Sequence, residues 1–101
     1  MFYIYIIYSA SAKKYYLGYS ANPFNRLRQH IESKGEKYTG MASDWEMKAV
    51  FKVSPIEAEA MKIEKFIKKQ KSRKLIETLC NQKFIPAGKL AQLIRVPHMR
   101  D

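Results

Sequence analysis

The 101-residue sequence is poor in cysteine and histidine, with Cys80 as its one cysteine and only two histidines. A single cysteine cannot form an internal disulfide, which fits a reducing compartment better than secretion. So few thiol and imidazole groups also argue against a structural zinc site, which uses four such ligands. We therefore expect a cytoplasmic protein with one domain and a single core that needs no disulfide.

Long hydrophobic runs are also missing. The apolar opening, residues 2–8, is far shorter than the roughly 20 residues of a membrane-spanning helix, and no basic residue precedes it. We therefore expect neither a membrane anchor nor a signal peptide. Pro86-Ala87-Gly88-Lys89 is not a P-loop, because it lacks the opening glycine and the Ser or Thr after the lysine.

Acidic residues are scarce as well. Nine of them stand against 19 Lys and Arg, which leaves a net charge of +10. On so small a body this charge produces a strong positive field. Because tyrosines are interleaved with the lysines, the composition indicates a nucleic-acid partner, while a membrane-surface role or a merely basic protein stays open.

Two tyrosine-rich strands are expected at the start of the chain, at residues 2–8 and 15–20. Because strand side chains alternate, one face of the first strand carries Phe2, Ile4, Ile6 and Tyr8. The other face carries Tyr3, Tyr5 and Ile7, so the two tyrosines present their phenols there. Glycine weakens a strand interior, so Gly18 in the second strand marks a place where something, such as a ligand, comes close to the backbone.

Strict alternation from Trp45 to Val53 predicts a third strand with one solvent-exposed face, so the sheet is expected to be antiparallel. The register of the first two strands matters for function. If Tyr5 and Tyr16 serve one site, they must share a sheet face, which requires partner numbers with an odd sum, such as Tyr5 opposite Gly18.

Asn22 and Pro23 predict the start of a helix that runs to about residue 33. Its inward stripe is expected to be Phe24, Leu27, Arg28 and Ile31. Arg26 and His30 lie four residues apart on another face, where both can act on one anionic group. The alternative is that the pair is an ordinary solvated face.

Ser54-Pro55-Ile56-Glu57 predicts the next helix through an N-cap, a first-turn proline and a capping-box glutamate. Its buried stripe is expected to be Ile56, Ala60, Ile63 and Ile67. Glu64 falls at the edge of this packed face, where a carboxylate can be held firmly and still meet a metal. The alternative is an ion pair with Lys68 at i+4.

Basic side chains cluster around the end of that helix, at Lys62, Lys65, Lys68, Lys69, Lys71, Arg73 and Lys74. They are too many for local ion pairing, so we expect them to follow a nucleic-acid backbone. In the polar loop of residues 34–43, Lys37-Tyr38-Thr39 is a second candidate for phosphate contact. Ser72 is expected to cap a last helix whose inward residues are Leu75, Ile76, Leu79 and Cys80.

We place a domain at residues 1–83 and a partly irregular C-terminal extension at 84–101, where Leu90, Leu93 and Ile94 can support one short helical turn.

Taken in order, the motifs resemble the small stand-alone members of the GIY-YIG nuclease family. The resemblance covers about residues 1–79. It rests on Tyr3-Ile4-Tyr5, Tyr16-Leu17-Gly18, Arg26-Leu27-Arg28-Gln29-His30, Lys37-Tyr38-Thr39 and Glu59-Ala60-Met61-Lys62-Ile63-Glu64-Lys65.

Two positions depart from the motifs of the family. Tyr3 replaces the glycine of the first motif, Leu17 replaces an isoleucine of the second, and the late asparagine has Asn81 as its counterpart. The resemblance implies an α+β fold in which helices pack on a three-stranded antiparallel sheet. It also implies a phosphodiester-cleaving site on the sheet and the first helix.

The same resemblance implies roles for single residues. Glu64 would hold one Mg²⁺ or Mn²⁺, and Arg26 would clamp the scissile phosphate. Tyr5 would be the general base and Tyr16 would orient water or phosphate, with His30 as an alternative base or leaving-group acid. Contacts to nucleic acid are expected from Tyr3, Gly18, Arg26, Lys37, Tyr38, Thr39, Lys68, Lys69, Lys71, Arg73 and Lys74.

A free phenol has a pKa of about 10, so Tyr5 needs the metal, Arg26 or the positive field to favour its ionised form. With one carboxylate for the metal, we expect weak affinity that depends on bound substrate. Two functions follow. One is a metal-dependent DNA endonuclease that acts on duplex, branched or damaged substrates in repair or recombination, and the other is a nucleic-acid-binding module with little turnover.

Overall fold

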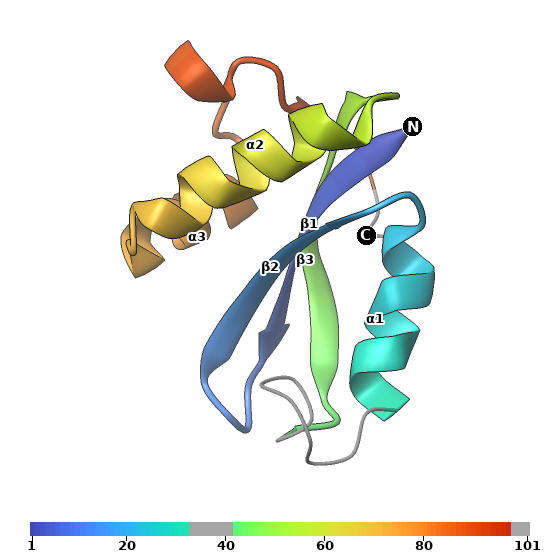
Figure 1. The fold of residues 1–101 in the computed structure, drawn as a ribbon. Helices are drawn as coiled ribbons and strands as arrows, with labels where there is room; N and C mark the ends of the chain where they lie inside the picture. The colour runs from blue at the N-terminus through green and yellow to red at the C-terminus, as the bar shows by residue number, and fades with distance from the viewer. Residues whose placement is uncertain (33–41, 98–101) are drawn as a thin grey trace.

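The computed structural model describes residues 1–32 and 42–97, which form an antiparallel sheet with helices on both faces (Figure 1). The sheet order is β2-β1-β3-β4. The strands are β1 (Phe2–Ser9), β2 (Lys14–Ser20), β3 (Trp45–Ser54) and β4 (Ile94–Arg95). The helices are α1 (Pro23–Glu32), α2 (Glu57–Lys69), α3 (Arg73–Cys80) and the 3-10 turn η2 (Gly88–Leu90). The predicted α+β architecture is confirmed, with one strand more than expected.

The fourth strand comes from the segment expected to be partly irregular. Ile94 pairs with Lys52 and Arg95 pairs with Phe51. The guanidinium of Arg95 lies 4.7 Å from the Phe51 ring centroid and donates to the backbone carbonyl of Asn81. Two residues are too few for an alternating pattern, so the sequence carries no strand signal here. The expected helical turn is present as η2, but Ile94 lies outside this turn and is 61% exposed.

β1 is one of the two inner strands of the sheet, and its alternating side chains are buried on both faces. Ile4 and Ile6 belong to the core under α2 and α3, which includes Ile63 and Leu79. Tyr5 and Ile7 belong to a second core, against which Leu27 and Ile31 of α1 pack. α1 therefore covers one face of the sheet, and α2 and α3 cover the other (Figure 1).

The alternation expected for β3 is interrupted, and the prediction of one exposed face is wrong. Ile6 pairs with Ala49 and Ile7 pairs with Met47, so the register passes over Lys48. This irregularity puts one extra residue into β3 and reverses which face the following side chains take. Met47 consequently belongs to the same core as Tyr5, whereas Ala49 belongs to the core of Ile4 on the opposite face.

Two of the predicted helix caps are confirmed and the third is wrong. Asn22 accepts from the Asn25 amide, and Ser72 accepts from the Leu75 amide. Ser54 instead ends β3 and accepts from the Ile56 amide, so α2 begins at Glu57 without a capping box. The predicted buried stripe of α2 holds for Ala60, Ile63 and Ile67, while Ile56 is 59% exposed.

The predicted inward face of α1 is partly wrong. Leu27 and Ile31 pack on the core, but Phe24 is 47% exposed and Arg28 is exposed. His30, for which an ordinary solvated face was the alternative interpretation, is buried. The helix is oriented so that this imidazole faces the sheet, where its partner is Tyr5.

No helix in the described part of the chain combines the length and the apolar character needed to cross a membrane.

Asp44 fastens the β1–β2 turn to the start of β3. Its carboxylate accepts from the hydroxyls of Ser9 and Ser11 and from the Ser11 amide. These donors lower the pKa of Asp44 from 3.8 to about 2, with the Ser9 hydroxyl as the largest cause. The carboxylate therefore contributes stability above the pKa of the unfolded chain and loses that contribution as the pH falls to the folded value.

We therefore expect the free energy of unfolding of the parent to fall between about pH 4 and about pH 2 more steeply than that of Asp44→Asn. Urea unfolding of both proteins across this range measures the difference. Glu46→Gln is the matched control, since Glu46 is an exposed carboxylate in the following strand. Parallel pH profiles for the parent and Asp44→Asn would contradict the role of Asp44.

Candidate functional site

The register of β1 and β2 is the predicted one. Tyr5 lies opposite Gly18 and Ile7 lies opposite Tyr16, so Tyr5 and Tyr16 share a face, with ring centroids 6.3 Å apart. A Cβ built on Gly18 would lie only 2.8 Å from the Tyr5 hydroxyl oxygen. The close approach predicted at Gly18 is thus made by the Tyr5 phenol.

His30 of α1 completes this aromatic group. Its Nε2 lies 2.8 Å from the Tyr5 hydroxyl oxygen, and its ring centroid lies 4.7 Å from that of Tyr16. With 6% exposure, the imidazole is held between the two tyrosines and the helix. Tyr5 and His30 therefore form a hydrogen-bonded pair through which a proton can move.

The electrostatics at Tyr5 differ from the expectation. Burial raises the pKa of the Tyr5 phenol from 10.0 to about 12, and Tyr16 adds to the rise. Arg26 lowers the pKa but does not overcome burial. In the protein by itself the phenol is neutral at ordinary pH, so the hydroxyl can donate to Nε2 of a neutral His30.

A cavity of about 410 Å³ opens beside this group, where residues of β1, β2, α1 and α2 meet. It is lined by Phe2, Tyr5, Tyr16, Gly18, Tyr19, Ser20, Ala21, Arg26, Glu57 and Glu64. Four residues predicted to be catalytic, from four different elements, therefore border one space, and His30 is attached to it through Tyr5.

The position of Glu64 is compatible with both interpretations made from the sequence, a metal ligand and an ion pair with Lys68. It borders the cavity, with a side chain 18% exposed, and its Oε2 lies 3.7 Å from Nζ of Lys68. Arg26, on the other side of the cavity, donates from Nη1 to Oε1 of Gln29 at 2.6 Å. The cavity thus has a carboxylate supplied by α2 and a guanidinium supplied by α1.

Five lining residues were not predicted for the site, namely Phe2, Tyr19, Ser20, Ala21 and Glu57. The Tyr19 hydroxyl donates to Oε2 of Glu57 at 2.9 Å. Glu57 precedes Glu64 by seven residues, or two helical turns, so their shared helix face was a usable signal. Tyr19 had no such signal, because its side chain alternates to the opposite face of β2 from Tyr16 and reaches the cavity past the sheet edge.

The donor set suits a hard cation that the substrate helps to hold. Residues 1–32 and 42–97 contain no cluster of three His, Cys, Asp or Glu side chains able to bind a metal. Mg²⁺ is commonly held by one or two carboxylates together with substrate phosphates, and the cavity offers Glu64 and Glu57. The residues therefore fit a weakly bound metal ion that is completed by phosphate oxygens.

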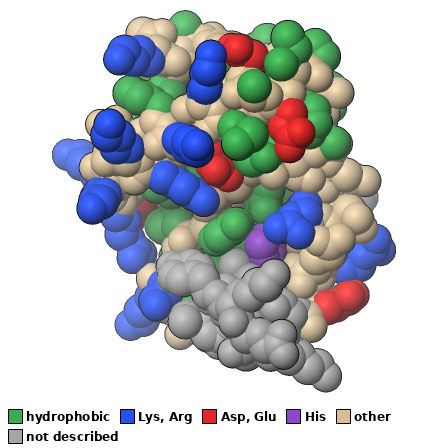
Figure 2. Space-filling model, in the orientation of Figure 1, with side chains coloured by type: hydrophobic (Ala, Val, Ile, Leu, Met, Phe, Trp, Pro, Cys, Tyr) green, Lys and Arg blue, Asp and Glu red, His purple; other side chains and the backbone are tan. Residues whose placement is uncertain are grey.

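The other predicted contacts are distributed unevenly. Tyr3 packs against the Tyr5 core and does not line the cavity. The patch at residues 37–39 lies outside the described residues. The basic residues of α2 and α3 are all exposed, and blue side chains gather over these helices in Figure 2. Three of them form ion pairs, namely Lys62, Lys68 and Arg73.

Comparison with known proteins places the chain in a family. No curated protein matches it. A family model described as the GIY-YIG catalytic domain matches residues 1–77, which span β1 to most of α3 and include every lining residue of the cavity. The match extends over most of the 101 residues, and members of this family are nucleases that act on DNA. The chain therefore belongs to the GIY-YIG family of nucleases.

Proposed function

We propose that this protein is a metal-dependent endonuclease that hydrolyses phosphodiester bonds in DNA, with the cavity beside β2 as its active site. One observation carries the proposal. Tyr5, Tyr16, Arg26 and Glu64 come from four elements and line the same space of about 410 Å³. Such a space, with a guanidinium on one side and a carboxylate on the other, suits a phosphate group and its cation.

The metal proposed is Mg²⁺ or Mn²⁺, held by Glu64 and by oxygens of the substrate. When bound, it would polarise the phosphate and stabilise the charge that develops on it. Arg26 holds the scissile phosphate through charge-assisted hydrogen bonds. Tyr16 borders the same space, where its phenol can orient the attacking water or a phosphate oxygen.

As water attacks the phosphorus, its proton passes to the Tyr5–His30 pair. The P–O bond to the leaving sugar oxygen breaks, and that oxygen takes a proton from solvent. Because burial raises the pKa of Tyr5 to about 12, its phenolate is too rare at neutral pH to act alone. The Tyr5 hydroxyl lies 2.8 Å from Nε2 of His30, so Tyr5 can pass its own proton to the imidazole as it accepts one from water. His30 is thus a positioning and proton-storing residue behind Tyr5.

The proposal is tested by incubating the purified protein with linear, branched and single-stranded DNA in Mg²⁺ or Mn²⁺. We expect cleavage that EDTA stops, with branched or damaged DNA preferred, as suits a role in repair or recombination. We also propose that the protein works in a reducing, cytoplasmic compartment, because the one cysteine of the sequence cannot form an internal disulfide. If no substrate is cleaved in either metal, the proposal that the protein is an endonuclease is wrong.

A binding module with little turnover is the second candidate. The high pKa of Tyr5 and the lack of a cluster of three metal ligands in the described residues favour it. One result distinguishes the two candidates. Both bind duplex DNA, but a binding module leaves it uncut in either metal.

Both candidates predict that binding depends steeply on salt. Lys65, Lys69, Lys71 and Lys74 have no ion pair within residues 1–32 and 42–97. If all four contact phosphates, counterion release predicts a slope of about −4 in log K against log salt. Titration of duplex DNA at several salt concentrations measures the slope, and Lys69→Gln should reduce it by about 1. A flat salt dependence would show that the basic residues are only a solvated face.

A further inference from the structure

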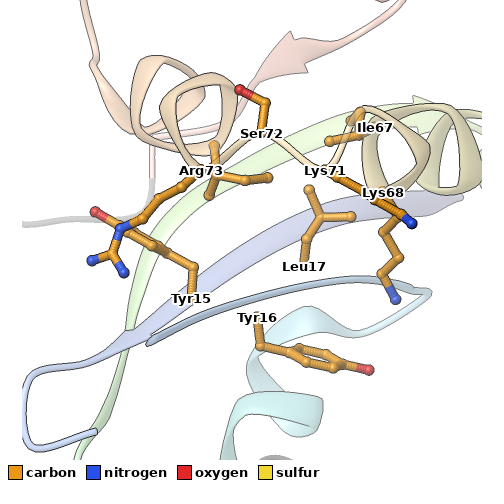
Figure 3. A pocket seen from close by; sticks show the side chains of 9 residues that line it. Tyr15, Tyr16, Leu17, Ile67, Lys68, Lys71, Ser72 and Arg73 are labelled. Carbon is orange, nitrogen blue, oxygen red and sulfur yellow. The ribbon is translucent and has the colours of Figure 1, made fainter. Parts of the chain in front are cut away.

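A second cavity, of about 530 Å³, lies between β2 and the turn that joins α2 to α3 (Figure 3). Leu17, Ile67 and Ile76 give it an apolar floor. Its volume falls within the range of about 300 to 1,000 Å³ typical of pockets that hold a small ligand. Neither the family match nor the proposed active site assigns a role to this space.

One wall of the cavity is aromatic and cationic. The guanidinium carbon of Arg73 lies 5.2 Å from the Tyr15 ring centroid, and Arg73 is held there by bonds to Glu77 and to the Lys13 carbonyl. A flat guanidinium on a tyrosine is a surface on which a nucleobase can stack. The wall is therefore suited to a planar ligand.

Cations border the cavity beside this wall. Lys71 lies in the turn after α2, with a φ of 50° in the left-handed region, and lines the cavity. Lys68 also lines the cavity, one turn earlier on the helix. With Arg73, three cationic side chains surround an apolar floor, which complements a group that is planar at one end and anionic at the other.

The second cavity adjoins the proposed active site across the edge strand of the sheet. Tyr16 lines both cavities, and its ring projects to the side of β2 opposite Tyr15 and Leu17 (Figure 3). Nζ of Lys68 lies 5.2 Å from the Tyr16 ring centroid and 3.7 Å from Oε2 of Glu64. Tyr16 and Lys68 thus connect the two spaces, so consecutive nucleotides can occupy both.

We propose that this second cavity binds one unpaired nucleotide of a single-stranded DNA segment next to the bond that is cleaved. The base stacks on the Tyr15–Arg73 wall, and its phosphate meets Lys71. A base in a duplex is stacked on both sides and must leave the helix to enter, which costs least for an unpaired nucleotide. The inference rests on the proposed function and gives its substrate class, which is DNA with a single-stranded branch or tail.

The test compares binding of two fluorescently labelled DNAs in EDTA, a blunt duplex and the same duplex with a single-stranded tail. Tyr15→Leu removes the aromatic wall, with Tyr15→Phe as its control. Lys71→Asn removes the cation and keeps a residue that tolerates the left-handed backbone. Its control is Lys52→Gln, at an exposed lysine that lines neither cavity. Thermal unfolding of every variant verifies the fold, and Lys71→Asn keeps the test decisive if Tyr15→Leu unfolds.

We expect the parent to bind the tailed duplex about tenfold more tightly than the blunt one. Tenfold corresponds to about 1.4 kcal/mol, which stacking of one base can supply. Tyr15→Leu and Lys71→Asn should lose this preference, and both controls should keep it. Iodouracil at the first tail position should photo-cross-link to Tyr15. Equal binding of the two DNAs by the parent, or a preference unchanged in folded Tyr15→Leu and Lys71→Asn, would overturn the inference.

This binding assay is independent of cleavage. A tail preference that depends on Tyr15 and Lys71 supports the second cavity as a binding site for an unpaired nucleotide even if no metal yields cleavage, in which case only the proposed endonuclease fails. Cleavage of DNA without any tail preference overturns the inference and leaves the endonuclease standing.

Discussion

Replacing Glu64 by glutamine is expected to abolish metal-dependent cleavage of DNA while leaving the fold intact. The amide has the size of the carboxylate but not its charge, so a cation held by Glu64 loses its protein ligand. Glu64 is 18% exposed and pairs with an exposed Lys68, so the free energy of unfolding should change by no more than about 0.5 kcal/mol. DNA binding without metal should hold or tighten, because one negative charge leaves a basic surface.

The measurement is single-turnover cleavage at matched Mg²⁺ or Mn²⁺, together with binding in EDTA and urea unfolding. Glu59→Gln is the matched control, since Glu59 also lies in α2 and also pairs with a lysine, but does not line the cavity. Glu57→Gln tests the second carboxylate of the cavity. Cleavage by Glu64→Gln at the parent rate would exclude the metal role of Glu64, and loss of cleavage only in Glu57→Gln would assign that role to Glu57.

Removing the hydroxyl of Tyr5 is expected to reduce both cleavage and stability. Tyr5→Phe deprives the attacking water of its proton acceptor, and loss of such a group lowers the rate by about 10²- to 10⁴-fold. It also leaves Nε2 of the buried His30 without the Tyr5 hydroxyl, and an unsatisfied buried polar group costs about 1–3 kcal/mol. Glu64→Gln should show the first effect without the second.

The control for Tyr5→Phe is Tyr8→Phe, a change of the same kind in the same strand that does not touch the cavity. The pH dependence of the parent's cleavage adds a second measurement. If Tyr5 had to ionise by itself, the rate would rise with pH toward its pKa of about 12. Transfer through His30 instead predicts a plateau well below that pH, and a continuous rise would exclude it. Unchanged cleavage by Tyr5→Phe would exclude Tyr5 as proton acceptor.

Local chemistry determined much of the structure. Alternation in β1 separates Tyr5 from Ile4 and Ile6 whatever the rest of the chain does, because successive strand side chains point to opposite faces. Asn22 and Ser72 cap helices through contacts within a few residues. The register that unites Tyr5 and Tyr16 could be inferred from the same alternation. These features depend on neighbours in sequence, which is why the sequence alone predicts them.

Tertiary structure decided how these elements meet. The register irregularity at Lys48 and the pairing of β4 depend on partner strands that no local pattern encodes. The rotation of α1 that buries His30 against Tyr5 depends on packing against the sheet. Burial likewise raises the pKa of Tyr5 and outweighs Arg26, which lowers it. The sequence by itself therefore determined which chemical groups the site contains, and only long-range packing decided their distances, their protonation and the second cavity beside them.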